Sequence, residues 1–372
     1  MKRLAFGAAL VALLLAGCDS GTAPDAKKAA EKAADKTAEV VEKTAEAAGK
    51  AVDSAKEAAG KVADKAAEVA DKAADKAVEV AEKAADKAVE VAEKAADKVA
   101  AAVAPGAKQV WEIGGLAGPE AALVVPAEGI MYVSNVDGEA LAKDGKGWIA
   151  KISLDGKTVN KDFATGLNAP MGLAISGGKL FAADIDEFVE INLADGKIVA
   201  KYPAEGAKRL NDAAADSQGN VYATDTLTNS VYRLSSGKVD VFVKDDQLAG
   251  PNGILVEGDN LIVNTWGVLS GEGWATKTPG GMFTVSLADK SIKAMGDGKS
   301  FGNLDGMISL GDGVYVVTDW MAGTVLKYGK DSKVDTILEL GQGAADMGYD
   351  PATKTMYVPQ MMKGTLHAVQ LP

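Results

Sequence analysis

The chain has 372 residues and a formal net charge of −12, of which residues 106–372, with 23 Lys and Arg against 33 Asp and Glu, carry −10. This length allows a large buried core, and the acidic balance disfavours partners that present nucleic-acid phosphates. The single cysteine, Cys18, excludes an intramolecular disulfide and a Cys-based zinc or redox site, and the single histidine, His367, leaves almost nothing for a Ser-His-Asp triad.

Residues 1–18 have the pattern of a bacterial lipoprotein signal. A basic start is followed by an apolar run too short to span a bilayer, which ends in Leu-Ala-Gly-Cys18. This resembles a lipobox, and the resemblance implies cleavage and lipidation at Cys18. We therefore expect a protein anchored to the cell envelope by acyl chains and facing the periplasm. An ordinary signal peptide with a chance cysteine is the alternative, and the choice between inner and outer membrane stays open because the effect of Asp19 on sorting depends on the host.

Residues 19–105 are built almost entirely from Ala, Lys, Glu, Asp and Val in an eleven-residue repeat, for example KAADKAVEVAE at 72 and again at 83. Eleven residues make nearly three α-turns, so one valine stripe persists, and Glu and Lys recur in the favourable i,i+4 order. We expect a long helix, roughly 110 Å from residue 28 to 103 at 1.5 Å per residue. A semi-rigid stalk is the favoured interpretation; a self-associating coiled coil or a membrane-surface helix are the alternatives.

Residues 106–372 contain short segments rich in Val, Ile, Tyr, Thr and Phe, separated by turn pairs such as Asp155-Gly156 and Gly219-Asn220. This pattern is typical of β-hairpins. Six units recur at a spacing near forty residues, and each predicts four strands. The predicted fold is therefore an all-β six-bladed β-propeller preceded by the helical stalk.

Two features of the propeller depart from a plain repeat. The last unit has no segment left for an outer strand, and residues 109–113, which precede the first unit, can supply it and close the ring. Residues 266–281 form an insertion that contains Trp266 and Trp274. We expect this insertion to form a lid or rim loop.

One polar position recurs just before the first strand of the units. The series, with one apolar member, is Glu120, Met171, Asn211, Asn252, Asp305 and Asp346. Because the innermost strands of a propeller all start at one end of its channel, we expect these side chains to converge on one space. Crowded carboxylates need a counter-ion, and oxygen ligands favour a hard cation, with calcium first and magnesium, manganese or zinc as alternatives. A solvated polar channel is the interpretation without a metal.

These motifs resemble the regucalcin/gluconolactonase family of six-bladed propellers, whose metal-dependent members open lactone rings. The resemblance implies that Glu120, Asn252 of the Pro-Asn-Gly motif, and Asp305 of the Asp-Gly-Met motif ligate one cation. The family's Arg-x-Asn-Asp motif corresponds to 209–212 and implies that Arg209 and Asn211 contact substrate. The order Gly-Pro-Glu at 118–120 departs from the family's Glu-Gly-Pro, and a lipoprotein stalk is unlike soluble members.

The resemblance leads us to expect a metal-dependent hydrolase of lactones or related esters, with Asp305 as general base and Arg209 and Asn211 as oxyanion and substrate contacts. A salt bridge with a loop carboxylate is the alternative for Arg209. Two other functions stay open, since propellers host many. One is a non-catalytic binding module on a stalk; the other is a metal-free condensing enzyme similar to strictosidine synthase.

Overall fold

The computed structural model describes residues 39, 42–44, 46–47, 49–50, 107–271 and 273–372. By its internal contacts the chain divides into two units, Met1–Val103 and Ala104–Pro372. In the first unit the described residues are helical, and Lys43–Glu39 and Lys50–Glu46 form i,i+4 ion pairs. The predicted signal, the lipidation site Cys18 and the rest of the predicted stalk lie outside the described residues. In the part of the chain that is described, no helix has the length and hydropathy to cross a bilayer.

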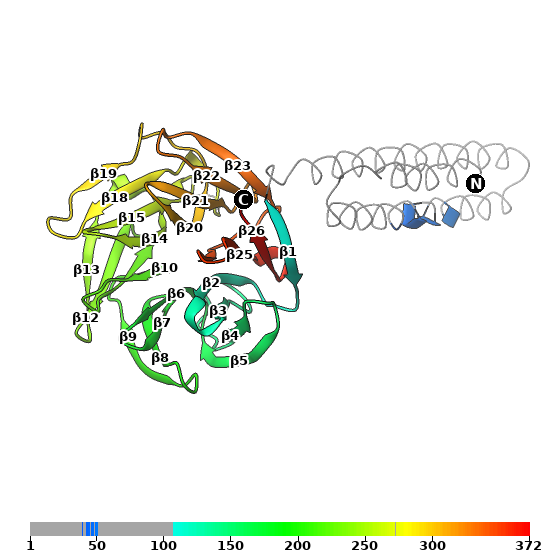
Figure 1. Ribbon diagram of the computed structural model, residues 1–372, viewed down its shortest axis with the longest axis horizontal. Coiled ribbons are helices and arrows are strands. Elements are labelled where there is room, and N and C mark those ends of the chain that lie inside the picture. Colours follow the sequence, from blue (N-terminus) through cyan, green and yellow to red (C-terminus); the bar gives the residue numbers. More distant parts are fainter. Residues whose placement is uncertain (1–38, 40–41, 45, 48, 51–106, 272) are drawn as a thin grey trace, which may run out of the picture. The chain divides into compact units, whose positions relative to one another are not determined.

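The second unit is a six-bladed β-propeller, as predicted (Figure 1). Blade 1 consists of β2 (Pro119–Val125), β3 (Ile130–Asn135), β4 (Gly147–Ser153) and β5 (Thr158–Leu167). Blade 2 consists of β6 (Pro170–Ser176), β7 (Lys179–Asp184), β8 (Glu187–Asn192) and β9 (Ile198–Pro203). Blade 3 consists of β10 (Leu210–Ala215), β11 (Val221–Asp225), β12 (Ser230–Ser235) and β13 (Lys238–Lys244).

Blade 4 consists of β14 (Pro251–Glu257), β15 (Asn260–Thr265), β18 (Met282–Ser286) and β19 (Ile292–Ala294). Blade 5 consists of β20 (Leu304–Gly311), β21 (Val314–Asp319), β22 (Thr324–Tyr328) and β23 (Val334–Glu339). Blade 6 consists of β24 (Gly348–Asp350), β25 (Thr355–Gln360), β26 (Thr365–Gln370) and β1 (Lys108–Ile113). Three short 3-10 helices, η1 (Pro126–Glu128), η2 (Asp246–Leu248) and η3 (Met361–Lys363), lie in connections.

Strand β1 closes the ring, which confirms the predicted exchange of the outer strand of the last blade. It pairs antiparallel with β26 from Lys108↔Gln370 to Ile113↔Leu366. Trp111 fixes the seam further, because its indole N–H donates to Leu154 O at 3.1 Å and its ring lies 5.7 Å from that of Tyr357. The first strand of the propeller is thereby joined to its last blade.

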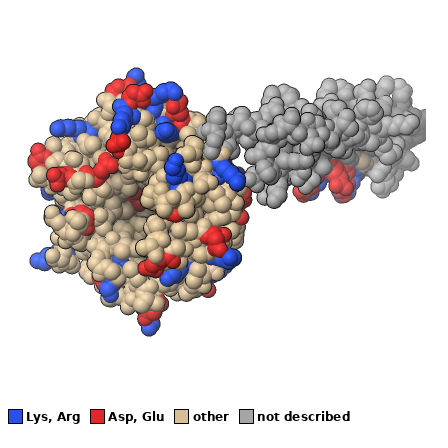
Figure 2. Space-filling view, in the orientation of Figure 1, with Lys and Arg blue, Asp and Glu red and all other residues tan. Residues whose placement is uncertain are grey.

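The core lies between blades rather than within one central mass. Alternate side chains of each sheet face the neighbouring sheet and form six clusters, one at each blade–blade boundary. Tyr132, Phe188, Leu210 and Tyr315 are among the fully buried members. On the face shown in Figure 2, charged side chains lie mainly toward the outer edge, and the surface around the central hollow is largely uncharged.

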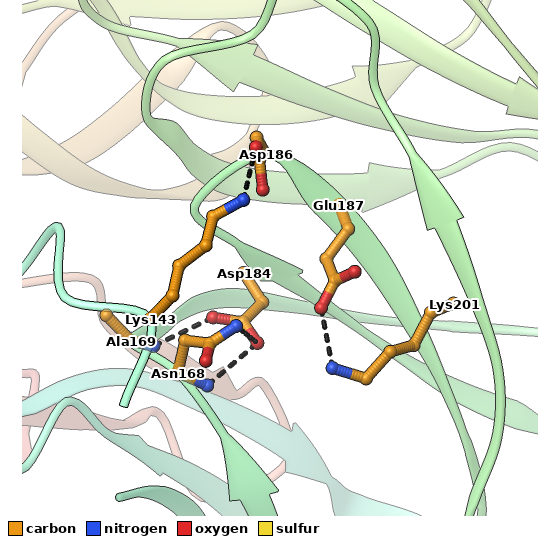
Figure 3. A network of polar contacts seen from close by, with 7 residues as sticks. All are labelled: Lys143, Asn168, Ala169, Asp184, Asp186, Glu187 and Lys201. Atoms are coloured by element: carbon orange, nitrogen blue, oxygen red, sulfur yellow. Dashed lines mark hydrogen bonds and ion pairs between the residues drawn. The ribbon is translucent and has the colours of Figure 1, made fainter. Parts of the chain in front are cut away.

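In four blades an acidic or amide side chain at the end of the second strand holds the turn that leads into the blade. Asp184, the last residue of β7, accepts hydrogen bonds from the backbone N–H groups of Asn168 (2.9 Å) and Ala169 (2.8 Å), as Figure 3 shows. Beside it, Lys143 of blade 1 donates to Asp186 of blade 2 at 2.6 Å (Figure 3). Asn135, Asp225 and Asp319 accept from the equivalent turns of their own blades. These contacts fix the backbone just ahead of the inner strand in these blades.

Candidate functional site

The polar series lies at a β-bulge that recurs in five blades. The register of the inner strand shifts at the same place in each: 119/122, 170/173, 210/213, 251/254 and 304/307. A bulge adds a residue to one strand and re-aims its side chains. Glu120, Met171, Asn211, Asn252 and Asp305 each sit within this extra segment. The bulge therefore explains why polar residues open otherwise apolar strands.

A bulge frees a backbone N–H group, and a second-strand side chain satisfies it in four blades. Ser134, Thr224, Asn264 and Thr318 accept hydrogen bonds of 2.8–3.1 Å from the backbone N–H groups of the residues that follow Glu120, Asn211, Asn252 and Asp305. All four acceptors are fully buried. Each acceptor is the next-to-last residue of the second strand of its blade. This recurrence of a polar residue is visible in the sequence, but the sequence analysis did not predict its role.

Four of the five predicted site residues meet around the amide of Asn211. In the orientation of that amide that satisfies both of its ends, its nitrogen lies 3.2 Å from Glu120 Oε1 and 3.2 Å from Asn252 Oδ1. Its oxygen lies 3.1 Å from Arg209 Nη1. Residues from blades 1, 3 and 4 are thus brought within hydrogen-bond distance, although 132 positions separate the first from the last in the chain.

The fifth residue, Asp305, joins the same group through Asn252, whose side chain donates a hydrogen bond to its carboxylate. Burial raises the pKa of Asp305 to about 7, opposed by the charge of Arg209 and the bond from Asn252. Burial raises the pKa of Glu120 well above its ordinary value, and the charges of Asp305 and Asp212 add to this. Both carboxyl groups are almost inaccessible, with 2% exposure for Glu120 and 4% for Asp305. Each therefore favours a proton or another positive charge beside it.

Two buried atoms in this group lack a hydrogen-bond partner: Glu120 Oε2 and Arg209 Nε. An unpartnered carboxylate oxygen in a buried site is costly unless a ligand satisfies it. No set of three Asp, Glu, His or Cys side chains is arranged to hold a metal in the described part of the chain. A cation would therefore need an amide ligand, and the oxygens of Glu120, Asn252 and Asp305 suit a hard divalent ion. These residues fit such an ion.

Asp346, which the sequence predicts to converge with the others, lies beside this group: the charges of Glu120 and Asp305 help to raise its pKa, and its backbone N–H donates to Glu120 O at 2.9 Å. Its backbone also bridges to Ala121, one residue beyond Glu120. Its carboxyl group is hydrogen-bonded to that of Asp212 from blade 3. Asp212 also accepts from the backbone N–H groups of Ile254 (2.7 Å) and Ala213 (2.6 Å). Asp212 and Asp346 thus form a second pair of acids beside the first group, which we call the second tier. Asp346 lies at a strand bridge instead of a bulge.

This second tier borders a cavity of about 350 Å³ along the inner strands. Its lining combines Asp212 and Asp346 with mostly apolar side chains such as Leu173, Ile254 and Met307. None of the five predicted site residues lines it. Burial, followed by the charges of neighbouring acids, raises the pKa of Asp346 well above its ordinary value, and burial raises that of Asp212 to about 7.

The insertion 266–281 reaches the site, as expected for a rim loop. It contains a hairpin of β16 (Gly267–Leu269) and β17 (Thr276–Pro279). The ring of Trp274 lies 4.4 Å from the Arg209 guanidinium carbon, and Trp266 Nε1 donates to Trp274 O at 2.9 Å. The predictions named Trp274 only as part of the insertion; its contact with Arg209 depends on the fold. His367, in contrast, lies in β26, where its ring pairs with Thr365 at 2.9 Å.

Three solved structures illustrate what the propeller is similar to. A gluconolactonase from Xanthomonas campestris has a TM-score of 0.53 at 15% identity, covering 73% of this chain and 96% of its own. A protein of unknown function from Bacteroides thetaiotaomicron has a TM-score of 0.52 at 11% identity, and the match covers 73% of this chain and 74% of that protein. A virginiamycin B lyase from Staphylococcus aureus has a TM-score of 0.48 at 16% identity, covering 72% and 100%. At these identities the likeness to the first two structures shows the fold alone.

A comparison with curated proteins gives no match. A family profile described as SMP-30/Gluconolactonase/LRE-like region matches residues 153–360, which is more than half of the chain and runs from the end of β4 through β25. The matched segment contains Arg209, Asn211, Asn252 and Asp305. The chain therefore belongs to the SMP-30/gluconolactonase/LRE-like family.

Proposed function

We propose that this protein is a metal-dependent hydrolase of lactones or related esters. The observation that carries the proposal is the buried group of Glu120, Asn211, Asn252, Asp305 and Arg209, in which Glu120 Oε2 and Arg209 Nε have no partner. A carboxylate oxygen and a guanidinium N–H that both lack a hydrogen-bond partner can bind a polarised carbonyl group. They therefore suit a reaction in which negative charge develops on the carbonyl oxygen. Membership of a family that includes gluconolactonases supports the same reaction class.

Glu120, Asn252 and Asp305 would hold the cation, with calcium favoured because all three supply oxygen. When bound, such an ion supplies positive charge that polarises a carbonyl and acidifies a water molecule. The side chains of the protein bind the substrate and transfer the proton. Arg209 binds the carbonyl oxygen and stabilises the negative charge that forms on it, and Asn211 holds Arg209 in place through its amide oxygen.

Asp305 is the general base of the proposed reaction. It takes a proton from the attacking water while the water oxygen bonds to the carbonyl carbon. The ring C–O bond then breaks, the proton passes to the departing alkoxide oxygen, and the product is a hydroxy acid. Asn252, which is hydrogen-bonded to Asp305, keeps its carboxylate oriented.

The test is acid release from a panel of lactones and aryl esters by the purified protein. We expect turnover that a chelator abolishes and that added calcium, manganese or zinc restores. Asp305→Asn should lower kcat at least about a hundredfold, in line with loss of a general base. Asp312→Asn, an exposed residue with 90% side-chain exposure, is the matched control and should leave kcat unchanged. Cation binding without turnover of any lactone or ester would favour the binding-module alternative.

We also propose that the protein is anchored to the bacterial cell envelope through lipid at Cys18 and faces the periplasm, with residues 19–105 as a stalk that could self-associate. The lipobox-like end of the signal supports this. Cells grown with labelled palmitate should yield labelled protein from the native gene and none from Cys18→Ser, which should also leave the membrane fraction. Equal labelling of both would exclude the anchor.

A further inference from the structure

One position of each blade forms a ring just outside the polar group. The residue directly after the second strand lies at the same end of the propeller as the bulge, because the second strand runs antiparallel to the first. These six residues, which we call the collar, are Val136, Ile185, Thr226, Trp266, Trp320 and Met361. Five of the six are apolar.

The apolar members are joined to one another by contacts. Val136 and Ile185 belong to one buried cluster with Met171, and Met361 packs against that cluster. Trp320 Nε1 lies 3.3 Å from Met361 Sδ. The Trp320 ring in turn lies 5.9 Å from that of Trp266, which lies 6.0 Å from that of Trp274. The collar is therefore a continuous apolar wall from blade 4 through blades 5, 6 and 1 to blade 2.

The one polar member stands where the wall meets Arg209. Thr226 of blade 3 has its hydroxyl 3.2 Å from the Asn211 amide and donates to Pro251 O at 3.0 Å. Its backbone N–H donates to Arg209 O. The site thus has one polar side, built by Arg209, Asn211 and Thr226, and is apolar around the rest of its rim.

The collar lies at the same end of the propeller as the polar group, whose members Glu120, Asn211, Asn252 and Asp305 are each at most 4% exposed. Trp274, Trp320 and Met361 are half-buried, and beyond them Met321 and Met362 are 38% and 66% exposed. The collar and these two methionines therefore present an apolar surface to solvent next to the buried acids. Thioether and indole groups accept flexible alkyl chains well.

We propose that the collar binds an alkyl or acyl substituent of the substrate, so that the site takes lactones or esters with an apolar chain in preference to polyhydroxylated sugar lactones. This inference rests on the hydrolase function proposed above. The physical reason is desolvation: sugar hydroxyls placed against Trp320, Met361 and Trp266 would lose water without gaining partners. An alkyl chain there gains affinity, about fourfold for each methylene that is covered.

Binding of γ-lactams tests this without turnover, because the amide ring resists hydrolysis. Isothermal titration of the purified protein with γ-butyrolactam and its 5-butyl and 5-octyl derivatives should show affinity rising by at least tenfold along the series. Gluconolactam, which carries hydroxyls instead, should bind more weakly than the butyl compound. Equal affinity along the series, or tightest binding of gluconolactam, would overturn the inference.

A matched pair of variants locates the effect. Met361→Gln places a polar group of similar size in the collar. We expect it to lower the affinity for the octyl compound about fivefold or more, and to change the affinity for the parent lactam less than twofold. Met361→Leu should keep the chain-length dependence. Met295→Gln alters a half-buried methionine packed beside Phe301 in blade 4, away from the collar, and should behave as wild type.

The two proposals fail separately. A chain-length dependence that Met361→Gln removes, in a protein that turns over no lactone, would uphold the collar and reject the hydrolase. Turnover of gluconolactone with no preference for alkylated rings would uphold the hydrolase and reject the collar.

Discussion

The guanidinium carbon of Arg209 lies over the ring of Trp274, 4.4 Å from the ring centroid, and this contact links the inserted hairpin to the buried acids. Arg209 Nε has no hydrogen-bond partner, so the Trp274 indole and the Asn211 oxygen are the contacts that orient the guanidinium. The insertion thereby acts as a support for the one cationic side chain in the group.

Replacing Trp274 by Leu should therefore impair the reaction without unfolding the protein. A cation–π contact of this kind contributes roughly 0.5–2 kcal/mol, which corresponds to about a 2- to 30-fold loss of kcat/KM for an unsubstituted lactone. Trp274→Phe keeps an aromatic face and should recover most of the activity. Steady-state kinetics on the three proteins measure this, and equal kcat/KM for Trp274→Leu and wild type would show that the stacking does not position Arg209.

Charge on Glu120 should decide whether a divalent cation binds. Glu120→Gln keeps the side-chain shape but removes the negative charge, so we expect cation affinity to fall at least tenfold, and Asn252→Ala to act in the same direction. Wild type should gain about 2.7 kcal/mol of stability when the free cation is at a hundred times its Kd. Calorimetric titration with calcium, manganese and zinc measures affinity, and Glu128→Gln, on the exposed side of the same blade, is the control that should bind normally.

Gly253 of the Pro-Asn-Gly motif should tolerate no side chain. A Cβ there would lie 2.3 Å from the backbone oxygen of Asp305 and 2.6 Å from Asn264 Nδ2, and the first of these cannot move without shifting blade 5. Gly253→Ala should lower the free energy of unfolding by about 2–3 kcal/mol. Gly114→Ala, whose nearest neighbours are 3.8 Å away, should be close to neutral. Urea denaturation compares the two, and a neutral Gly253→Ala would contradict the close packing of blades 4 and 5.

His367 should make the ring seam sensitive to acid. Burial lowers the pKa of His367 to about 4, with Lys363 adding to the effect and the cross-strand Glu112 opposing it. In the unfolded chain the imidazole has a pKa of about 6.5, so as the pH falls the unfolded state takes up a proton before the folded state does. The contribution to stability is therefore complete above that pH and is lost as the pH falls from about 6.5 toward 4.

Comparison with His367→Gln isolates this contribution, because the other titrating groups are common to both proteins. Between pH 7.5 and pH 5 wild type should lose roughly 2 kcal/mol more unfolding free energy than the variant. Urea denaturation at several pH values measures it. Parallel curves for the two proteins would mean that the imidazole is protonated as readily in the fold as outside it.

Much of the architecture could be predicted from the sequence because it depends on local pattern. Alternating β-branched and aromatic residues between Gly- and Asp-containing turns specify hairpins, and their repeat near forty residues specifies blades. The missing outer strand of the last unit, together with residues 109–113, predicted the closure that β1 makes with β26. The positions of Glu120, Asn211, Asn252 and Asp305 in equivalent places predicted that they meet.

Other features depended on contacts between blades, which no local pattern encodes. The bulge that re-aims Asn252, and the Asn264 side chain that satisfies its neighbour, require two paired strands in register. Asp346 occupies the expected place in its repeat, yet it bridges to Ala121 and bonds to Asp212 across the channel. The sequence could not distinguish the two tiers, because the bond between Asp346 and Asp212 depends on how blades 3 and 6 face each other across the channel.

The sequence by itself determined the repeat, the strand order and the identity of the polar residues, since each follows from side-chain type and spacing along the chain. Only the tertiary structure decided which of them touch, that Trp274 covers Arg209, and that the residues after the second strands form one apolar collar. The physical reason is that ring closure brings together residues from different blades, and their separation in space depends on packing between sheets rather than on distance along the chain.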